Sequence, residues 1–434
     1  MKPKPNIGRD TDCYIKDTIE FDLSLPPYKK KTLANGVEVY CIDLGNSPST
    51  MITWIFDAGM LWEEKKLVAT ISNALLKSGT RTRSALGIGE HFKYYGTYTS
   101  GFVQYETAEF TIGCLNKSLG EVLPVVADIL SNSAYPQHEI EEFVKGGRQN
   151  LQLHLQRRDF IANRLMNSYL YGKQHPLGKP TVAEDYLGPR QSDITNFFDR
   201  FYRQGGCRII AAGQLPGDVI TRLDSAFGFL PIHPIDRIGS NRRSFPIMPA
   251  ACKKYVISSG LEASECSIRI ARSLPNQHHP DFIRLPMLNI VFGGYIGSRL
   301  KNNIRKAKGY GYEIHSFLIN NSHDGCLVVV VEAAKEVCSF VIAEVYKEMN
   351  RLRKDLIGES ELQKARDFAI SSFLDDLKDP FKVAALWKSI LLNRQGDGYF
   401  ADHIQVIKTI TPDEIQELAI KYLEPNDFFE LTVI

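Results

Sequence analysis

Apolar and polar residues alternate along the chain in patterns that predict both strands and helices. After the turn signal Asn35-Gly36, apolar residues at every second position predict a hairpin over Thr32–Ile42. Further strands are predicted at Met51–Ala58, Tyr105–Cys114 and Cys207–Ala212. Helices are predicted at Lys65–Lys77, Ala85–Tyr94, Leu119–Ser131, Gln137–Leu155 with a continuation to Tyr171, and Ser192–Tyr202. Strands and helices mixed in this way indicate an α+β protein.

The second half of the chain repeats the order of the first. Two pairs of segments correspond at offsets of 222 and 221 residues: Glu139-Ile140-Glu141 with Glu361-Leu362-Gln363, and Asp193-Ile194-Thr195 with Glu414-Ile415-Gln416. This recurrence predicts two homologous halves, each an antiparallel sheet covered by helices, arranged like a clam. We expect an N-terminal arm at 1–25, a first domain at 26–228, a proline-rich linker at 229–250 and a second domain at 251–434.

Composition narrows the class of protein only moderately. The net charge of +2 over 434 residues favours neither nucleic acid nor an anionic membrane as a partner. The apolar runs, such as Cys326–Val331, are too short to span a membrane. The charged, proline-broken start at residues 1–5 does not read as a secretory signal, so a cytoplasmic protein is predicted; a periplasmic protein whose signal had been removed would look the same. The eight cysteines form no C-x-x-C pair, and we expect buried free thiols.

A glycine-rich and basic stretch, Leu288–Ser316, holds the first candidate for chemistry. An apolar run broken by glycines leads into a basic helical segment at Arg299–Lys308, which Gly309 is expected to end, and a strand follows at Tyr310–Phe317. The turn could aim Arg305 and Tyr312 at one point, where a guanidinium and a phenol would stabilise a developing oxyanion. The alternative is that the glycines serve packing and that both side chains are solvated. A nucleotide-binding loop is disfavoured, because the glycine spacing and the Lys-Ser/Thr ending are missing.

This stretch resembles the C-terminal half of the pitrilysin-type zinc peptidases, which include the mitochondrial processing peptidase and smaller bacterial relatives. The resemblance rests on Gly-Ser-Arg-Leu at 297–300, Ile-Arg-Lys-Ala-Lys-Gly at 304–309 and the tyrosine after that glycine. It implies that Arg305 and Tyr312 assist the peptide carbonyl while zinc lies in another half-domain. The chain departs from the family at Lys306, where an acidic residue is usual.

The zinc motif of that family, H-x-x-E-H, is absent from this chain. In the family, two histidines at i and i+4 on one helical face and a later glutamate bind the zinc, and the glutamate between the histidines is the general base. Counting back from the landmark Ser78-Gly79-Thr80 leaves three residues at the motif's positions and a fourth at the later ligand: Thr70, Asn73, Ala74 and Asn150. None of these is a competent zinc ligand or base. The pair Glu90-His91 is a decoy, because its first histidine position is Gly87 and it lies beyond the landmark.

Loss of the zinc half-site with retention of the Arg/Tyr segment resembles the zinc-free subunit of the heterodimeric members. The resemblance implies a peptide substrate, a homologous partner that carries H-x-x-E-H and its zinc, and no cofactor in this chain itself. Arg305 and Tyr312 would then act in trans. The alternative is a scaffold or peptide-binding protein of the same fold, like the core subunits of respiratory complexes that resemble this family. A homodimer of the isolated chain is also possible.

Overall fold

The computed structural model describes residues 20–235, 245–260, 264–320 and 324–434. Residues 1–19 of the predicted arm, residues 236–244 of the predicted linker, and Cys13 lie outside the described residues.

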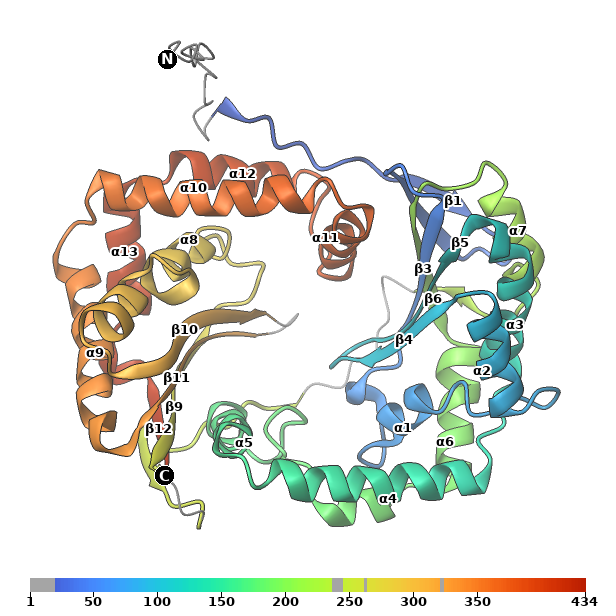
Figure 1. Cartoon of the computed structure of the whole chain (residues 1–434), viewed down its shortest axis with the longest axis horizontal. Coiled ribbons are helices and arrows are strands. Elements are labelled where there is room, and N and C mark those ends of the chain that lie inside the picture. The colour runs from blue at the N-terminus through green and yellow to red at the C-terminus, as the bar shows by residue number, and fades with distance from the viewer. Residues whose placement is uncertain (1–19, 236–244, 261–263, 321–323) are drawn as a thin grey trace, which may run out of the picture.

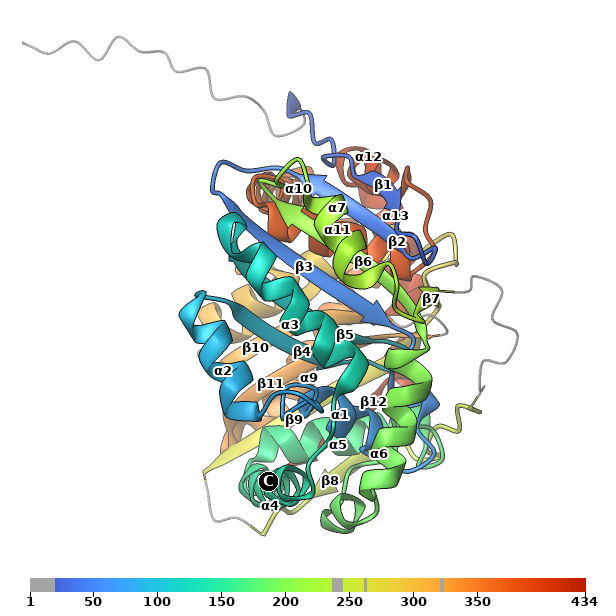
Figure 2. The same cartoon turned by 90° about the vertical axis from the view of Figure 1, so that its right-hand side faces the viewer.

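The first half of the chain forms one sheet with its helices packed on the outer face (Figure 2). The strands lie in the order β1-β2-β6-β3-β5-β4, with the short β7 beside β6. Its core is built from alternate residues of β3 and β6, such as Trp54 and Ile209, beneath α3 and α7. The elements are β1 (Lys29–Thr32), β2 (Glu38–Asp43), β3 (Ser49–Phe56), α1 (Val68–Ala74), α2 (Ala85–Tyr94), β4 (Tyr98–Val103), β5 (Ala108–Leu115), α3 (Leu119–Asn132), α4 (Gln137–His154), α5 (Arg158–Tyr171), α6 (Gln191–Phe198), a π-helix (Asp199–Arg203), β6 (Gly206–Gly213), α7 (Val219–Phe227) and β7 (His233–Pro234).

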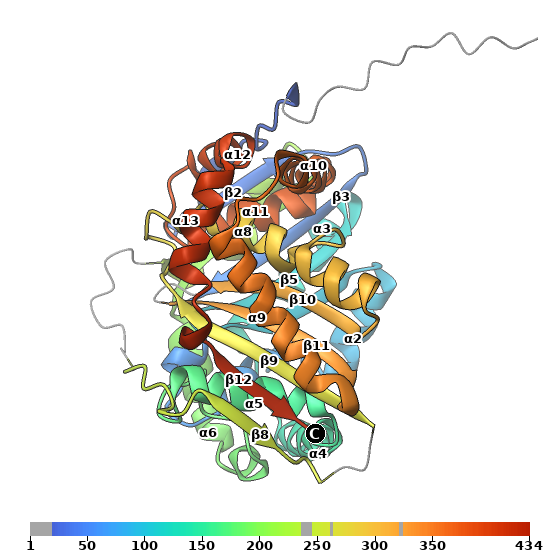
Figure 3. The same ribbon diagram turned by 90° about the vertical axis from the view of Figure 1, so that its left-hand side faces the viewer.

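The second half forms another sheet, in the order β10-β11-β9-β12-β8, again with helices on the outer face (Figure 3). The elements are β8 (Lys254–Ile257), β9 (Glu265–Leu274), α8 (Leu285–Asn289), π-helices at Ile290–Gly294 and Lys301–Ala307, β10 (Gly311–Asn320), β11 (Gly325–Ala334), α9 (Cys338–Lys354), α10 (Glu359–Asp376), α11 (Pro380–Leu392), α12 (Tyr399–Thr409), α13 (Pro412–Tyr422) and β12 (Phe429–Val433). The predicted α+β class with two sheet-and-helix halves is confirmed.

The predicted elements of the first half are found with few changes. The hairpin around Gly36, whose φ is 85°, and helix α2 match their predicted places. The predicted helix Lys65–Lys77 is shorter, because Leu67 adopts a left-handed backbone at one end, and after Ala74 the backbone changes to turns such as the bond from the Leu76 amide to the Asn73 carbonyl. The strand predicted from Tyr105 begins only at Ala108.

Each half places one helix on the inner face of the other half's sheet (Figure 1). Ala162, Met166 and Leu170 of α5 belong to a buried cluster with Ala271 of β9 and Leu431 of β12. Helix α11 lies in the same way against β6 and β2 of the first sheet. The domain boundaries at 228 and 251 therefore stay a prediction, since the two cores are completed by exchanged helices.

Polar contacts accompany both exchanged helices. Lys388 of α11 forms an ion pair of 2.7 Å with the buried Glu109 of β5. On the other side, Arg269 Nε of β9 donates to Asn163 Oδ1 of α5 at 2.7 Å. These contacts fix the two halves against each other.

The segment before β1 runs along the second half before it enters the first sheet (Figure 1). Lys408 Nζ donates to the carbonyl of Phe21 and Trp387 Nε1 to that of Pro26, both at 2.7 Å. Leu23 is buried in the core of the second half. The described end of the predicted arm thus packs on this chain's own second half.

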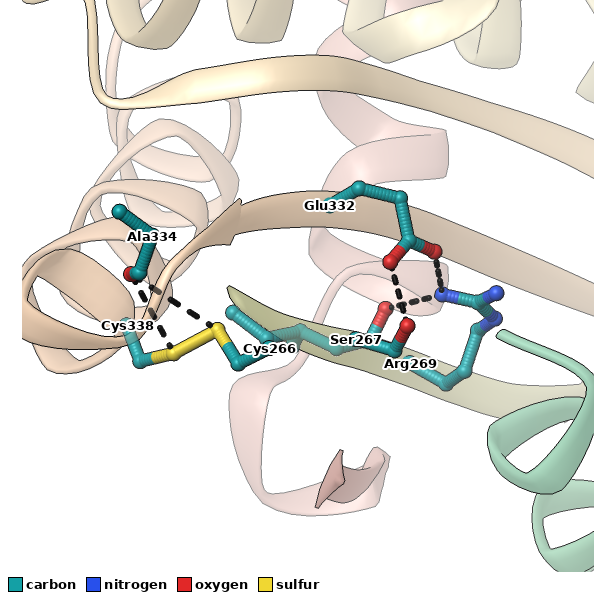
Figure 4. The surroundings of a disulfide bond; sticks show 7 residues. Cys266, Ser267, Arg269, Glu332, Ala334 and Cys338 are labelled. Carbon is teal, nitrogen blue, oxygen red and sulfur yellow. Dashed lines mark hydrogen bonds and ion pairs between the residues drawn. A yellow bond between two sulfur atoms is a disulfide. The ribbon is translucent and has the colours of Figure 1, made fainter. Parts of the chain in front are cut away.

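A disulfide joins Cys266, near the start of β9, to Cys338, the first residue of α9 (Figure 4). The prediction of free thiols is therefore wrong for these two residues, because the sheet and helix bring together cysteines 72 residues apart in sequence. The described cysteines that are free and buried are Cys41, Cys114, Cys207 and Cys326, and Cys252 is free but exposed. Beside the disulfide, Arg269 Nη1 forms a 2.9 Å ion pair with Glu332 across β9 and β11.

Candidate functional site

The four positions predicted to correspond to the zinc motif lie on two helices of the first half. Thr70, Asn73 and Ala74 are on α1, and Asn150 is exposed on α4. Ala74 is also exposed, whereas Asn73 is buried. These side chains do not fit a zinc ion, because an alanine cannot ligate and neutral amide and hydroxyl groups are poor zinc ligands. Within the described residues, no group of three or more His, Cys, Asp or Glu side chains could hold a metal ion.

Asn73, at the position of the general base, is committed to the core. Its Nδ2 donates to the backbone carbonyl of Glu109 at 3.0 Å and to the Tyr202 hydroxyl at 3.1 Å. A Cβ on Gly101 of β4 would lie 2.4 Å from Asn73 Oδ1, so the amide fills the space between helix and sheet. Burial raises the pKa of Tyr202, which therefore stays a neutral hydroxyl. Asn73 is thus a structural residue that joins α1 to β5 and to the segment after α6.

The decoy residues are ordinary helix residues. His91 Nε2 lies 2.9 Å from the backbone oxygen of Glu121, and the Gly87 amide donates to the Ser84 hydroxyl that caps α2.

The Arg/Tyr segment has an irregular backbone at both candidate residues. Arg305 lies in the π-helical turn Lys301–Ala307, and π-helical turns are rare and concentrate at functional sites. Gly309 ends the helix with a φ of 66°, as predicted. The Tyr310 amide then donates to the Ile304 carbonyl at 3.0 Å, which brings the strand back beside the helix. The register of β10 shifts between Gly311 and Glu313, so Tyr312 lies in a β-bulge.

Both candidate side chains point to solvent. Tyr312 is 64% exposed and Arg305 is also exposed. In the part of the chain that the structure describes, no hydrogen bond or ion pair is formed by either side chain. A guanidinium and a phenol left uncommitted on neighbouring turns remain available to a carbonyl oxygen.

Carboxylates from two helices anchor this segment. Arg299 forms a two-point contact with Glu361 of α10, at 2.8 and 3.1 Å. Asn303 Nδ2 donates to Glu344 and Glu348 of α9, at 2.8 and 2.6 Å. Sequence analysis missed these anchors because the partners are 41 to 62 residues away and no local pattern links them.

A cavity of about 760 Å³ lies at the junction of the two halves. Its walls mix cations and carboxylates, among them Lys30, Arg208, Asp57 and Asp397. Neither Arg305 and Tyr312 nor the former zinc positions line it. The cavity is therefore separate from both predicted sites.

The chain resembles peptidases and their relatives over most of its length. Residues 191–368 match the family described as the Peptidase M16 inactive domain. An uncharacterized zinc protease of Rickettsia felis is 23% identical over 391 residues, which are 89% of this chain and 90% of that protein. The β subunit of the human mitochondrial-processing peptidase is 24% identical over 379 residues, 81% of this chain and 73% of that protein.

Solved structures share the fold. A peptidase M16 inactive domain from Pseudomonas fluorescens superposes with a TM-score of 0.83 at 17% identity, covering 94% of this chain and 98% of that one. A chain of Complex III2 from Candida albicans superposes with a TM-score of 0.73 at 15% identity, covering 93% and 95%. The predicted resemblance to the pitrilysin-type peptidases is confirmed by these comparisons. Among the described helices, none is long and apolar enough to cross a membrane.

Proposed function

Since this chain belongs to the M16, or pitrilysin-type, peptidase family, we propose that it is the zinc-free subunit of a heterodimeric metallopeptidase. Its partner is a homologous subunit that carries H-x-x-E-H and supplies the zinc. Arg305 and Tyr312 of this chain complete the partner's active site by contacting the carbonyl of the peptide bond that is cleaved.

One contrast carries the proposal. The zinc positions are filled by non-ligands, and Asn73 has been recruited into core hydrogen bonds, so this half cannot have kept a dormant site. The Arg/Tyr segment, in contrast, keeps two exposed donors on a π-helix and a β-bulge that helices α9 and α10 anchor. A pure scaffold would have no need for two exposed donors on irregular turns that other helices anchor.

The chemistry asked of this chain is electrostatic. As the carbonyl oxygen gains negative charge, a permanently charged guanidinium and a phenol can each donate a hydrogen bond to it. Docking of the partner would remove water from both exposed side chains, and donors in a dry site stabilise charge more strongly than donors in water.

The alternative is a non-catalytic scaffold or peptide-binding protein. The similarity to a chain of Complex III2 favours this candidate, because that chain is part of a larger complex by its name. Under this alternative Arg305 and Tyr312 have no catalytic role and no zinc-binding partner is required.

The two candidates differ in one experiment. Zinc content and cleavage of a quenched fluorogenic peptide mixture are measured for this chain, for the H-x-x-E-H homologue from the same genome, and for both together. The proposal expects this chain to be metal-free and inert, and the mixture to cleave faster than the homologue alone. A homologue that cleaves equally well without this chain, or that does not bind it, contradicts the proposal and favours the scaffold.

A further inference from the structure

Asn303 occupies the centre of the turn that carries Arg305. It lies two residues before Arg305 in the π-helix Lys301–Ala307, and its single amide nitrogen donates to two carboxylates of α9. The neighbouring Ile304 is fully buried in the core of the second half. Within this turn, as the structure describes it, Asn303 is the residue whose side chain bonds to another helix.

The two carboxylates that accept from Asn303, Glu344 and Glu348, suit a neutral hydrogen-bond donor. Glu344 and Glu348 are one turn apart on α9, and Glu348 is only 3% exposed. Three cations already neutralise the pair: Lys308 and Lys347 contact Glu344, and Arg351 contacts Glu348 at 2.8 Å. The ion pair with Lys308, helped by the hydrogen bond from Asn303, lowers the pKa of Glu344, so its carboxylate is ionised at neutral pH. The two carboxylates accept from the one amide nitrogen of Asn303, at 2.8 and 2.6 Å, so each can take one of its two N–H groups and the amide is held in one orientation.

The hydrogen bonds of Asn303 also affect the position of Tyr312. Lys308, the residue that follows this turn, is bound to Glu344, so the two bonds hold both sides of Arg305 against α9. The Tyr310 amide donates to the Ile304 carbonyl. This bond couples the position of the turn to that of the bulge at Tyr312. A shift of Asn303 would therefore move both donors together.

We propose that Asn303 is the positioning residue of this site: through Glu344 and Glu348 it fixes Arg305 and Tyr312 where a peptide carbonyl is to be met. The positioning role in catalysis rests on the function proposed above, whereas the anchoring of the turn does not.

The test replaces the amide nitrogen of Asn303 by an oxygen atom. Asn303→Asp keeps the size of the side chain, removes both N–H donors and places a third carboxylate against Glu344 and Glu348. Asn302→Asp makes the same chemical change one residue away, at an exposed side chain whose bond is to the local Gly297 carbonyl. The double variant Asn303→Asp/Glu348→Gln restores a donor and an acceptor in exchanged places.

Two readouts are compared for these variants. In this chain alone, hydrogen exchange of residues 299–312 is expected to quicken in Asn303→Asp, to stay unchanged in Asn302→Asp and to return towards wild type in the double variant. In the mixture with the H-x-x-E-H subunit, kcat for the fluorogenic peptides should fall on the order of 10²-fold in Asn303→Asp, with KM nearly unchanged, because the donors are misplaced rather than lost.

The outcomes separate the two proposals. Exchange in Asn303→Asp that equals wild type overturns the anchoring role, and a double variant that recovers neither readout overturns it too, since general destabilisation would then explain the loss. Quickened exchange with an unchanged kcat overturns the positioning role in catalysis. A wild-type mixture without cleavage contradicts the proposed function itself, and the exchange data still decide whether Asn303 anchors the turn.

Discussion

Reduction of the Cys266–Cys338 disulfide should destabilise the protein measurably. The bond closes a loop spanning 72 residues between the start of β9 and the start of α9. Opening a loop of this length returns conformational entropy to the unfolded chain, which amounts to about 4 kcal/mol at 25 °C in the chain-entropy description. This is a large fraction of the stability of an ordinary protein, so the effect should be well outside experimental error.

Urea unfolding, followed by circular dichroism with and without a phosphine reductant, measures the difference. We expect the midpoint of the wild type to fall on reduction, and that of Cys266→Ser to be low under both conditions. Cys252→Ser is the matched control, because Cys252 is free and exposed. A wild-type midpoint that does not fall, although thiol titration shows that the reductant has opened the bond, would refute the reasoning.

The same bond bears on where the protein works. Disulfides persist in oxidising compartments and are rare in the cytosol. If rapid alkylation of native cells traps an intact Cys266–Cys338 bond, an exported protein is favoured over the cytoplasmic location predicted from the sequence. If both thiols are trapped free, the cytoplasmic prediction is favoured.

Three further predictions follow from buried polar groups of the first half. Asn73→Ala should cost about 1–3 kcal/mol in urea unfolding, because it leaves the Glu109 carbonyl and the Tyr202 hydroxyl without their partner, whereas Ala74→Ser at the exposed neighbour should be nearly neutral. Lys388→Met should cost about 3 kcal/mol, since Glu109 stays buried without a counter-charge, and adding Glu109→Gln should recover most of the loss. Burial raises the pKa of Glu63 from 4.5 to about 7. Because the folded state then keeps a proton that the unfolded chain releases, stability should fall as pH rises from about 4.5 to 7, by at most about 3 kcal/mol, and Glu63→Gln should remove this slope; a slope that survives the substitution would contradict the assignment.

Local signals in the sequence were enough to place helices whose start or end depends on residues within or next to the helix itself. Helix α2 begins at Ala85 and the Arg305 helix ends at Gly309, as predicted from the sequence. Where tertiary contacts decide, the prediction from sequence was incomplete. Helix α1 begins later than predicted because Leu67 adopts a left-handed backbone, and β4 was not predicted at all. The exchange of α5 and α11 between the halves has no local signal, because nothing in the sequence of either helix specifies which sheet it covers.

The sequence nominated the residues of the candidate site, and those assignments stay predictions, whereas the geometry around them could not be predicted. The spacing from Ser78-Gly79-Thr80 predicts that Thr70, Asn73, Ala74 and Asn150 stand where the family has its zinc ligands and base. The π-helix at Arg305 and the bulge at Tyr312 could not be predicted, since both depend on the anchors to Glu344, Glu348 and Glu361 far along the chain.

The most direct measurement of the central proposal is kcat of the two-subunit complex with Arg305→Ala compared with Lys306→Ala. Both residues are exposed cations on adjacent positions of the same turn, so charge loss and folding are matched. If Arg305 donates to the carbonyl oxygen in trans, Arg305→Ala should lower kcat by about 10²–10³-fold and Lys306→Ala should leave it close to wild type. Equal activities of the two variants, with the complex intact, would contradict the account.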